Sequence, residues 1–383
     1  MIRLISPQED IPAAFLMNRG VVSLELSSFR SYETFMLSAE LKPIVLTGPN
    51  GVGKTNLLEA LSFLIPGRGL RRAKLRDIRQ QGHESPWAVS YQLNDGEGYL
   101  QIGTGQDSEN PDRRLVKING EKAKSQGTLA EWVSMVWLTP QMDRLFLEGS
   151  QGRRRFLDRL VYGLDPAHAQ RLSRYEHALK ERNLLLRQGS YDSRWMEGLE
   201  EILINEGVPI TLARQEVILQ LQGVLKTQDP SFPRPHLSLQ GEVETLLQVQ
   251  KSLDAEEELR QRIADSRGHD RMTGRTSLGP HQSDLMVIFP QKNQQAALCS
   301  TGEQKALLLS IVMASAHLLS VRTGAIPLLL LDEVVAHLDK DRRKALFEAI
   351  LRLNMQTWLT GTDQSLFEEL EGQGQFVELG RTD

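Results

Sequence analysis

The chain has 383 residues, of which 40% are hydrophobic and 25% are charged, and its formal net charge at pH 7 is −4. This length allows two or three domains, and the slightly negative balance means that any surface for a polyanion must be a local patch. The single cysteine, Cys299, excludes an internal disulfide and a metal site built from several cysteines. It also favours a reducing compartment, so we expect a cytoplasmic protein.

The first 18 residues contain two prolines and two acidic residues and lack the sustained apolar core of a secretory signal, so they are expected to form an N-terminal extension. Alternating apolar positions then predict a strand over 21–29, and residues 32–46 have room for two more strands. Short strand-like runs between 87 and 120 are separated by the turn-forming residues 94–96 and 119–120. These turns predict hairpins and therefore an antiparallel sheet.

Residues 48–55 form the pattern Gly-x-x-x-x-Gly-Lys-Thr, between an apolar strand signal at 44–46 and a helix-forming stretch at 56–61. This context is the one that a phosphate-binding P-loop requires. Its glycines let backbone N–H groups approach a phosphate, and the helix N-terminus adds a positive dipole end. Lys54 is expected to reach the β- and γ-phosphates of ATP and Thr55 to bind Mg²⁺. The loop residues expected to hold the nucleotide are Gly48, Asn50, Gly51, Gly53, Lys54, Thr55 and Asn56.

Helical periodicity dominates from about residue 153 to 265, and Pro209 with the proline-rich cluster 229–235 is expected to break this region into several helices. Strand and helix signals alternate again after 276. The apolar region 306–319 is interrupted by polar residues and predicts a buried helix. The α/β pattern predicts an ATPase head made of 19–150 and 276–383, in which a P-loop sheet with flanking helices joins an antiparallel β subdomain. A helical arm, 151–275, is inserted into this head.

The apolar run 327–331 ends in two carboxylates, Asp332 and Glu333. Such a run is typical of a buried parallel strand, and we expect it beside the P-loop strand. Asp332 would then hold Mg²⁺, and Glu333 would act as the general base that polarises the attacking water. Shortly before this strand, Ser300 and Gly302 precede a long helix. They fit either a second anion site or an ordinary helix N-cap.

The order and spacing of these motifs are those of ABC-type ATPases, and the chain resembles the RecF family of bacterial repair ATPases, which are related to SMC proteins. The stretches that carry the resemblance are 28–32, 48–61, 68–71, 152–158, 279–285, 300–309, 331–339 and 360–363.

The resemblance implies a homodimer that closes on ATP, with each nucleotide between the P-loop of one subunit and the signature of the other. This assigns Ser300, Gly302 and Gln304 to the partner's nucleotide and Asp339 to a loop that monitors the partner. Gln141 would lie near Mg²⁺ and contribute to catalysis. Thr362 occupies the switch position, where transporter heads carry histidine.

The resemblance also implies binding to duplex and gapped DNA, weak DNA-stimulated ATP hydrolysis, and action with RecR and RecO to load recombinase. Residues 68–79 supply a candidate phosphate-binding segment with six basic residues against one acidic residue: Arg68, Arg71, Arg72, Lys74, Arg76 and Arg79. Arg153–Arg155 could contact DNA or tie the arm to the head. The alternatives are an ABC transporter subunit, which the arm disfavours, and an SMC-like architectural ATPase, for which the arm is too short and proline-broken.

Overall fold

The computed structural model describes residues 19–80, 82–189, 192–249 and 252–380, and the predicted extension 1–18 lies outside them. The chain forms two compact units. Over the described residues, the first unit comprises 19–143, 227–233 and 301–380, and the second comprises 144–226 and 234–300. The second unit extends further along the chain than the arm predicted over 151–275, because the residues up to 300 pack with it.

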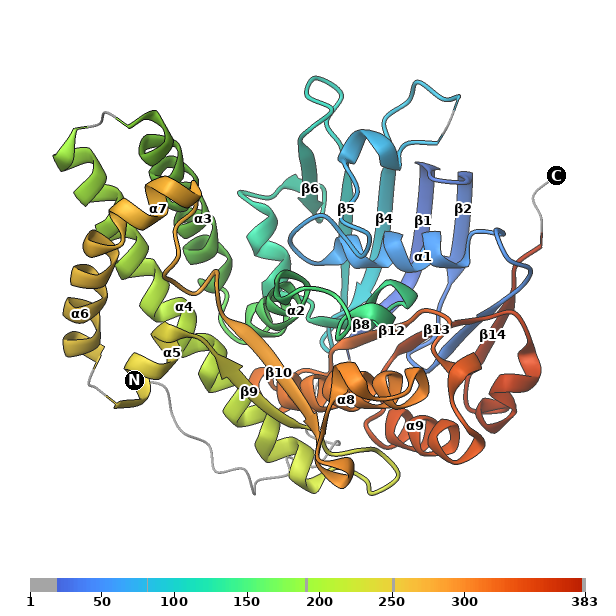
Figure 1. Ribbon diagram of the computed structural model, residues 1–383. Helices are drawn as coiled ribbons and strands as arrows, with labels where there is room; N and C mark the ends of the chain where they lie inside the picture. Colours follow the sequence, from blue (N-terminus) through green and yellow to red (C-terminus); the bar gives the residue numbers. More distant parts are fainter. Residues whose placement is uncertain (1–18, 81, 190–191, 250–251, 381–383) are drawn as a thin grey trace. The chain divides into compact units, whose positions relative to one another are not determined.

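An antiparallel sheet forms one layer of the first unit (Figure 1). Its strands, in the order β2-β1-β4-β5-β6-β7, are β2 (Tyr32–Ser38), β1 (Gly20–Phe29), β4 (Ala88–Asn94), β5 (Tyr99–Gln106), β6 (Arg114–Ile118) and β7 (Glu121–Lys122). Alternate side chains point into the core, as in a sheet with one solvated face. The predicted turn at Asn119 and Gly120 is present, and both residues have positive φ angles, 49° and 83°.

A parallel sheet forms the second layer, in the order β14-β3-β13-β12-β8. Its strands are β14 (Gln375–Glu378), β3 (Ile44–Thr47), β13 (Thr357–Gly361), β12 (Leu328–Leu331) and β8 (Met135–Leu138). The expectation that the Asp-Glu strand lies directly beside the P-loop strand was wrong, because β13 is hydrogen-bonded between β3 and β12. The two strands nevertheless end at the same edge of the sheet, since all of these pairings are parallel.

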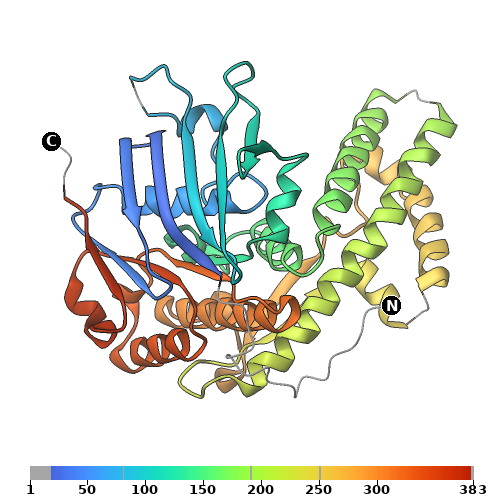
Figure 2. The same ribbon diagram turned by 180° about the vertical axis from the view of Figure 1, so that it is seen from behind.

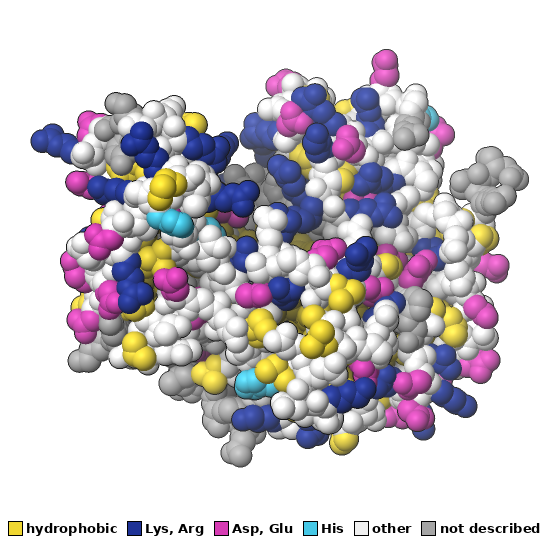
Figure 3. Space-filling view, viewed as in Figure 1, with side chains coloured by type: hydrophobic (Ala, Val, Ile, Leu, Met, Phe, Trp, Pro, Cys, Tyr) yellow, Lys and Arg dark blue, Asp and Glu magenta, His cyan; other side chains and the backbone are white. Residues whose placement is uncertain are grey.

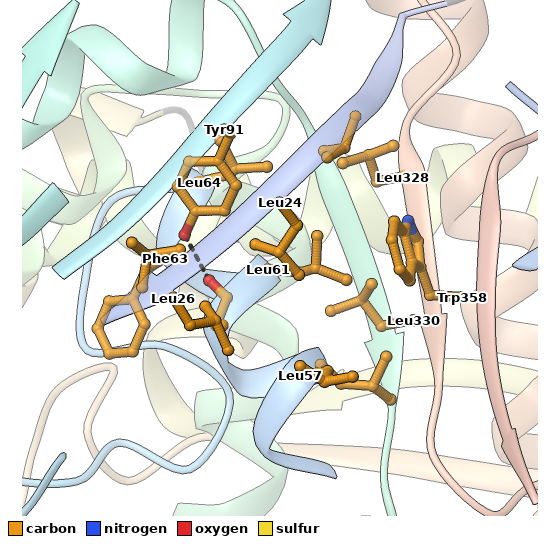
Figure 4. Packing of buried hydrophobic residues seen from close by; sticks show 14 of the residues in the cluster. Leu24, Leu26, Leu57, Leu61, Phe63, Leu64, Tyr91, Leu328, Leu330 and Trp358 are labelled. Atoms are coloured by element: carbon orange, nitrogen blue, oxygen red, sulfur yellow. Dashed lines mark hydrogen bonds between the residues drawn. The ribbon is translucent and has the colours of Figure 1, made fainter. Parts of the chain in front are cut away.

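Helix α1 (Lys54–Leu61) packs between the two sheets, and the core of the first unit forms around it (Figure 4). Leu57 and Leu61 of α1 lie between Leu24 of the antiparallel sheet and Leu330 and Trp358 of the parallel sheet. Each such leucine contributes about 1.5–3 kcal/mol when it is fully buried. Helices α8 (Thr301–Thr323) and α9 (Lys340–Arg352) lie on the other side of the parallel sheet (Figures 1 and 2). Short helical turns complete this unit: η2 (Ser62–Leu64), η3 (Leu75–Ile78), η4 (Gln126–Glu131), η5 (Pro140–Arg144), η8 (Val335–His337) and η9 (Gln364–Leu370).

Helix α8 contains the apolar region 306–319 and is longer than that region alone suggested. Among the described residues it is the one helix whose length and mean hydropathy, 1.6, would suit a membrane span. However, 78% of this apolar window is buried inside the protein. The prediction of a buried helix is therefore confirmed by its packing.

The second unit consists of six helices and a small sheet among its described residues. The helices are α2 (Ser150–Tyr162), α3 (His168–Gln188), α4 (Ser193–Thr227), α5 (Glu242–Val249), α6 (Ser252–Asp265) and α7 (Arg267–Thr273). The sheet, in the order β11-β10-β9, joins β11 (Gln294–Gln295), β10 (Asp284–Phe289) and β9 (His236–Gln240), with the turns η6 (Pro290–Lys292) and η7 (Ala296–Leu298) beside it. Strand β9 was not predicted, and pairing with it places the predicted strand 285–289 in this unit.

The prediction that Pro209 ends a helix was wrong, because α4 continues through it for 35 residues. A proline inside a helix removes the hydrogen bond to the carbonyl four residues earlier, which here belongs to Asn205, an exposed residue. Two residues beyond the proline, Thr211 donates a hydrogen bond of 3.0 Å to Gly207 O. Burial of the opposite face of α4 outweighs the cost of about 3 kcal/mol for an interior proline.

Candidate nucleotide site

The P-loop runs from the end of β3 to the start of α1, as predicted. Gly48 and Gly53 have φ angles of 143° and 108°, which side chains other than glycine rarely adopt. A Cβ atom at Gly48 would lie 2.5 Å from Leu379 O, and one at Gly53 would lie 2.5 Å from the Tyr32 hydroxyl. Both glycines are therefore required by the space around the loop as well as by its backbone conformation.

Lys54 is buried, and its ammonium group folds back over the loop. The Nζ atom donates hydrogen bonds of 2.6 Å to Gly48 O and 3.0 Å to Pro49 O. Burial lowers the pKa of Lys54, while the nearby carboxylates of Glu333 and Asp332 oppose that shift. A cation held only by neutral carbonyls is poised to exchange them for phosphate oxygens.

Thr55 and Asp332, two of the three residues predicted at the Mg²⁺ site, are in direct contact, and Gln141 is the third. Thr55 Oγ1 donates to Asp332 Oδ1 at 3.0 Å. The same oxygen accepts a hydrogen bond of 2.8 Å from the hydroxyl of Thr360, at the end of β13. Burial raises the pKa of Asp332, and the two threonine hydrogen bonds only partly counter this effect. A desolvated carboxylate beside a hydroxyl is a suitable oxygen site for a hard cation.

Glu333 lies one residue beyond Asp332 and has an unusual backbone conformation, with φ of 54°. Its N–H donates a hydrogen bond of 2.9 Å to Thr360 Oγ1, which holds it in place. Such left-handed residues cost roughly 1–3 kcal/mol and are enriched at functional sites. Thr360 thus positions both acidic residues, and it is a site residue that the sequence analysis did not single out. The sequence offered only its place in the stretch 360–363, because the position of β13 beside β12 is set by contacts between distant segments.

The remaining predicted ATP-site residues occupy different places. Gln141 is exposed in η5, just after β8, whose register with β12 brings it to the carboxyl edge that carries Asp332. Asp339 caps α9 by accepting a hydrogen bond of 2.9 Å from Arg342 N, and Thr362 is exposed after β13.

The predicted signature begins in the second unit and continues in the first. Ser300 and Gly302 are exposed, whereas Gln304 is buried. The next residue, Lys305, forms an ion pair of 2.7 Å with Asp143 and so anchors the start of α8 to η5.

The basic segment 68–79 is mostly exposed, but its arginines differ in what they contact. Arg71 is half-buried and donates hydrogen bonds to Asn56 Oδ1, at 2.9 Å, and Glu59 Oε2, at 3.4 Å. Arg76 makes a bidentate pair with Asp112, with distances of 2.8 and 2.7 Å, and Arg79 donates to a backbone carbonyl. Arg68, Arg72 and Lys74 are exposed. Arg71 thus connects this segment to the P-loop helix.

Arg153 and Arg154 form contacts within the second unit, where they hold α2 against Ser283 and the start of β10. Arg153 forms a bidentate pair with Asp284, with distances of 2.7 and 2.8 Å. Arg154 donates to Ser283 O at 2.5 Å, and Arg155 is exposed. These contacts support the interpretation of Arg153 and Arg154 as ties, although the tie lies within the second unit.

A buried ionic cluster continues from α2. Asp158 accepts two hydrogen bonds from Arg214 of α4, at 2.8 and 3.0 Å, and lies 2.9 Å from His168 Nε2. Burial alone would raise the pKa of Asp158, but these two partners outweigh it and lower that pKa. A charge this deep is stable only when it is paired and hydrogen-bonded.

His281 lies in the stretch 279–285, one of those that carry the resemblance, and its ring is held in one tautomer. Its Nε2 lies 2.9 Å from Thr276 O and must donate to that carbonyl, so its Nδ1 accepts from the hydroxyl of Tyr175 at 2.6 Å. Burial lowers the pKa of His281. Both ring nitrogens are therefore engaged in holding the loop, and His281 has a structural role.

The comparisons with known proteins agree with this geometry. A family model described as the RecF/RecN/SMC N terminal domain matches residues 20–378. The DNA replication and repair protein RecF of Mesorhizobium japonicum is 44% identical over 362 residues, which covers 94% of this chain and 96% of that protein. RecF of Rhizobium etli is 45% identical over 359 residues, which covers 93% of this chain and 96% of that protein.

Solved structures show the same fold. A structure of the recombination mediator protein RecF-ATP in the RecFOR pathway has a TM-score of 0.77 and 23% identity, over 91% of this chain and 94% of that one. The Smc head domain of Pyrococcus furiosus has a TM-score of 0.54 and 15% identity, over 95% of this chain and 94% of that one. The predicted ABC-type ATPase head is therefore confirmed as the fold.

Proposed function

We start from the fact that this chain belongs to the RecF family of DNA replication and repair proteins, and we propose that it is an ATP-gated clamp on DNA. In this proposal two copies close around ATP and Mg²⁺, bind duplex or gapped DNA, and help RecR and RecO to load recombinase in the cytoplasm. The observation that carries the proposal is the contact between Thr55 of the P-loop and Asp332 at the end of β12, 3.0 Å apart.

The chain's own groups have separate tasks in nucleotide binding. Lys54 would release its carbonyl partners and bind the β- and γ-phosphates, while the N–H groups of residues 50–56 surround the phosphate chain. Thr55 and Asp332 fit Mg²⁺ because they already bring two oxygen donors together. When bound, this cation would neutralise phosphate charge.

Hydrolysis would require a base and a closed site. Glu333 is the proposed base, and the hydrogen bond from its N–H to Thr360 holds its backbone in the left-handed conformation. The exposed Ser300 and Gly302 would reach the nucleotide of the partner subunit, with Gln304, Gln141, Asp339 and Thr362 around them. Because neither copy alone supplies the complete site, ATP hydrolysis should be slow until two heads close.

DNA would act through the basic segment. Exposed residues such as Arg68, Arg72 and Lys74 would contact the phosphate backbone without reading sequence. Arg71 contacts Asn56 of α1, so a displacement of segment 68–79 on binding DNA would be transmitted to the P-loop helix. This contact supports stimulation of a weak ATPase by DNA.

A mixing experiment tests whether the site is shared between subunits. Lys54→Ala removes the phosphate-binding cation, and Ser300→Arg blocks the signature, so each variant alone should lack ATPase activity. A mixed dimer contains one doubly altered site and one intact site, and an equal mixture should regain up to about a quarter of the normal rate. Lys344→Ala, an exposed change on α9, is the control. Failure of the mixture to regain activity would overturn the shared site.

A trapping experiment tests the roles of single residues. Glu333→Gln should bind ATP and accumulate as a dimer, because hydrolysis would be lost while the fold is retained. Lys54→Arg should stay monomeric with ATP. Light scattering with and without ATP measures both outcomes. A monomeric Glu333→Gln protein at saturating ATP would contradict the proposal.

A further inference from the structure

A second basic surface lies next to the segment 68–79 in the first unit. Here the loop after η2 meets the hairpin of β6 and β7 and encloses a groove of about 560 Å³. Four exposed cations line it: Arg68, Arg113, Lys122 and Lys124. Figure 3 shows Lys and Arg side chains gathered over this part of the molecule. Its one acidic lining residue, Asp112, is already paired with Arg76.

The walls of the groove are tied together by hydrogen bonds. Arg114 is buried and donates to Phe63 O, to Ile65 O at 3.1 Å and to Gly67 O at 3.0 Å, so that β6 holds the loop carrying Arg68. Burial lowers the pKa of Arg114 to about 10, which leaves it charged at neutral pH. The Gln126 side chain accepts from Gly67 N at 3.3 Å. The groove is therefore built into the fold before any ligand binds.

The hairpin places like charges opposite each other. Lys117 of β6 and Lys122 of β7 are directly paired across the two strands, and both are exposed. Like charges at this spacing destabilise a hairpin, because opposite charges would be favourable there. A bound polyanion would remove this cost. The pairing is an observation independent of the groove itself, and it points to the same kind of ligand.

We propose that this groove, lined by Arg68, Arg113, Lys122 and Lys124, binds the phosphodiester backbone of duplex DNA and extends the contact made by segment 68–79. The inference rests on the proposed function and adds a second set of contacts to it. A nucleic acid backbone is favoured over an acidic protein segment, because Arg68 belongs both to this groove and to segment 68–79, so that one continuous phosphate backbone could contact both. Of the four cations, Arg68 was predicted as part of segment 68–79. Arg113, Lys122 and Lys124 were not predicted, because they are scattered between 113 and 124 and converge only through the hairpin.

The test compares two triple variants that remove the same charge. One carries Arg113→Gln, Lys122→Gln and Lys124→Gln. The control carries Lys42→Gln, Lys344→Gln and Arg352→Gln, in the same unit and outside the groove. Duplex binding with ATP is measured over a range of salt concentrations. The groove variant should lose about 2 to 3 from the slope of log affinity against log salt, and the control should keep the slope of the unaltered chain.

Thermal unfolding separates lost contacts from lost structure. Removing Lys122 relieves the repulsion from Lys117, so the groove variant should melt no earlier than the control. Equal salt slopes in the two variants would overturn the groove proposal alone, whereas failure of the unaltered chain to bind duplex would overturn both proposals. If the groove variant no longer binds polyglutamate but keeps the salt slope of DNA binding seen for the unaltered chain, the groove binds an acidic protein partner. That result would also overturn the proposal.

Discussion

Gln356 joins the two sheets of the first unit and provides a quantitative test of how the head is held together. It lies directly before β13 and is buried. Its Oε1 accepts from Val21 N at 2.8 Å, and its Nε2 donates to Val21 O at 2.7 Å and to Glu40 O at 2.8 Å. One side chain thus completes the hydrogen bonding of β1 and of the segment after β2.

Gln356→Met keeps the length of the side chain and removes all three hydrogen bonds. Val21 is fully buried, so its N–H and C=O would lose their partners without gaining water. Each unsatisfied buried group costs roughly 1–3 kcal/mol, and Glu40 O is closer to solvent and should cost less. We therefore expect the free energy of unfolding of the first unit to fall by about 3–5 kcal/mol.

Gln375 provides the matched control. It stands at the start of β14, accepts from Glu40 N at 2.8 Å and donates to Ser38 O at 2.8 Å, and these hydrogen bonds are exposed. Water can replace them, so Gln375→Met should cost only about 1 kcal/mol. Urea unfolding followed by tryptophan fluorescence suits the measurement, since four of the five tryptophans lie in the first unit. Equal losses in the two variants would refute the reasoning.

Three further predictions concern buried charges and polar groups. Because the pKa of Asp332 is raised in the folded state, ionisation of this group lowers the stability of the fold as the pH rises past the pKa that Asp332 has in the unfolded chain. Asp332→Asn should therefore raise the free energy of unfolding by roughly 0.5–2 kcal/mol at pH 7, and it should abolish ATPase activity. Trp358 Nε1 has no acceptor among the described residues, whereas Trp87 Nε1 donates to a carbonyl at 2.9 Å. In melting experiments, Trp358→Phe should therefore be better tolerated than Trp87→Phe. Arg214→Met should cost about 3–5 kcal/mol, because it removes the guanidinium partner of the buried Asp158 and leaves it only His168. Because the folded pKa of Asp158 is lowered, the unaltered pair should lose its stabilisation as pH falls in acid titrations.

Local patterns predicted the strands and helices of the first unit well. The P-loop, the hairpin turn at 119–120 and the run 328–331 depend on neighbours in sequence, which is why they could be recognised. Strand order depends on contacts between distant segments. Nothing in the residues around Asp332 indicates that β13 lies between β12 and β3.

The errors in the second unit have a similar cause. Helix α4 passes through Pro209 because tertiary packing outweighs the local preference of proline. Strand β9 follows a proline-rich stretch, and its pattern over five residues is too short to stand out until it pairs with β10. For the candidate site, the acidic pair and the P-loop were predictable from motifs. The role of Thr360 required the geometry of β13.

The strand order of the parallel sheet has a consequence for how the protein is made. The P-loop strand, β3, pairs with β13 and β14, which begin more than 300 residues after it in the chain. Until those two strands have been synthesised, β3 lacks both neighbours, and until Asp332 has been synthesised, Thr55 lacks the carboxylate that it contacts. A prematurely terminated product would carry the complete P-loop motif without the means to hold a nucleotide, and its unpaired strand edges would favour aggregation.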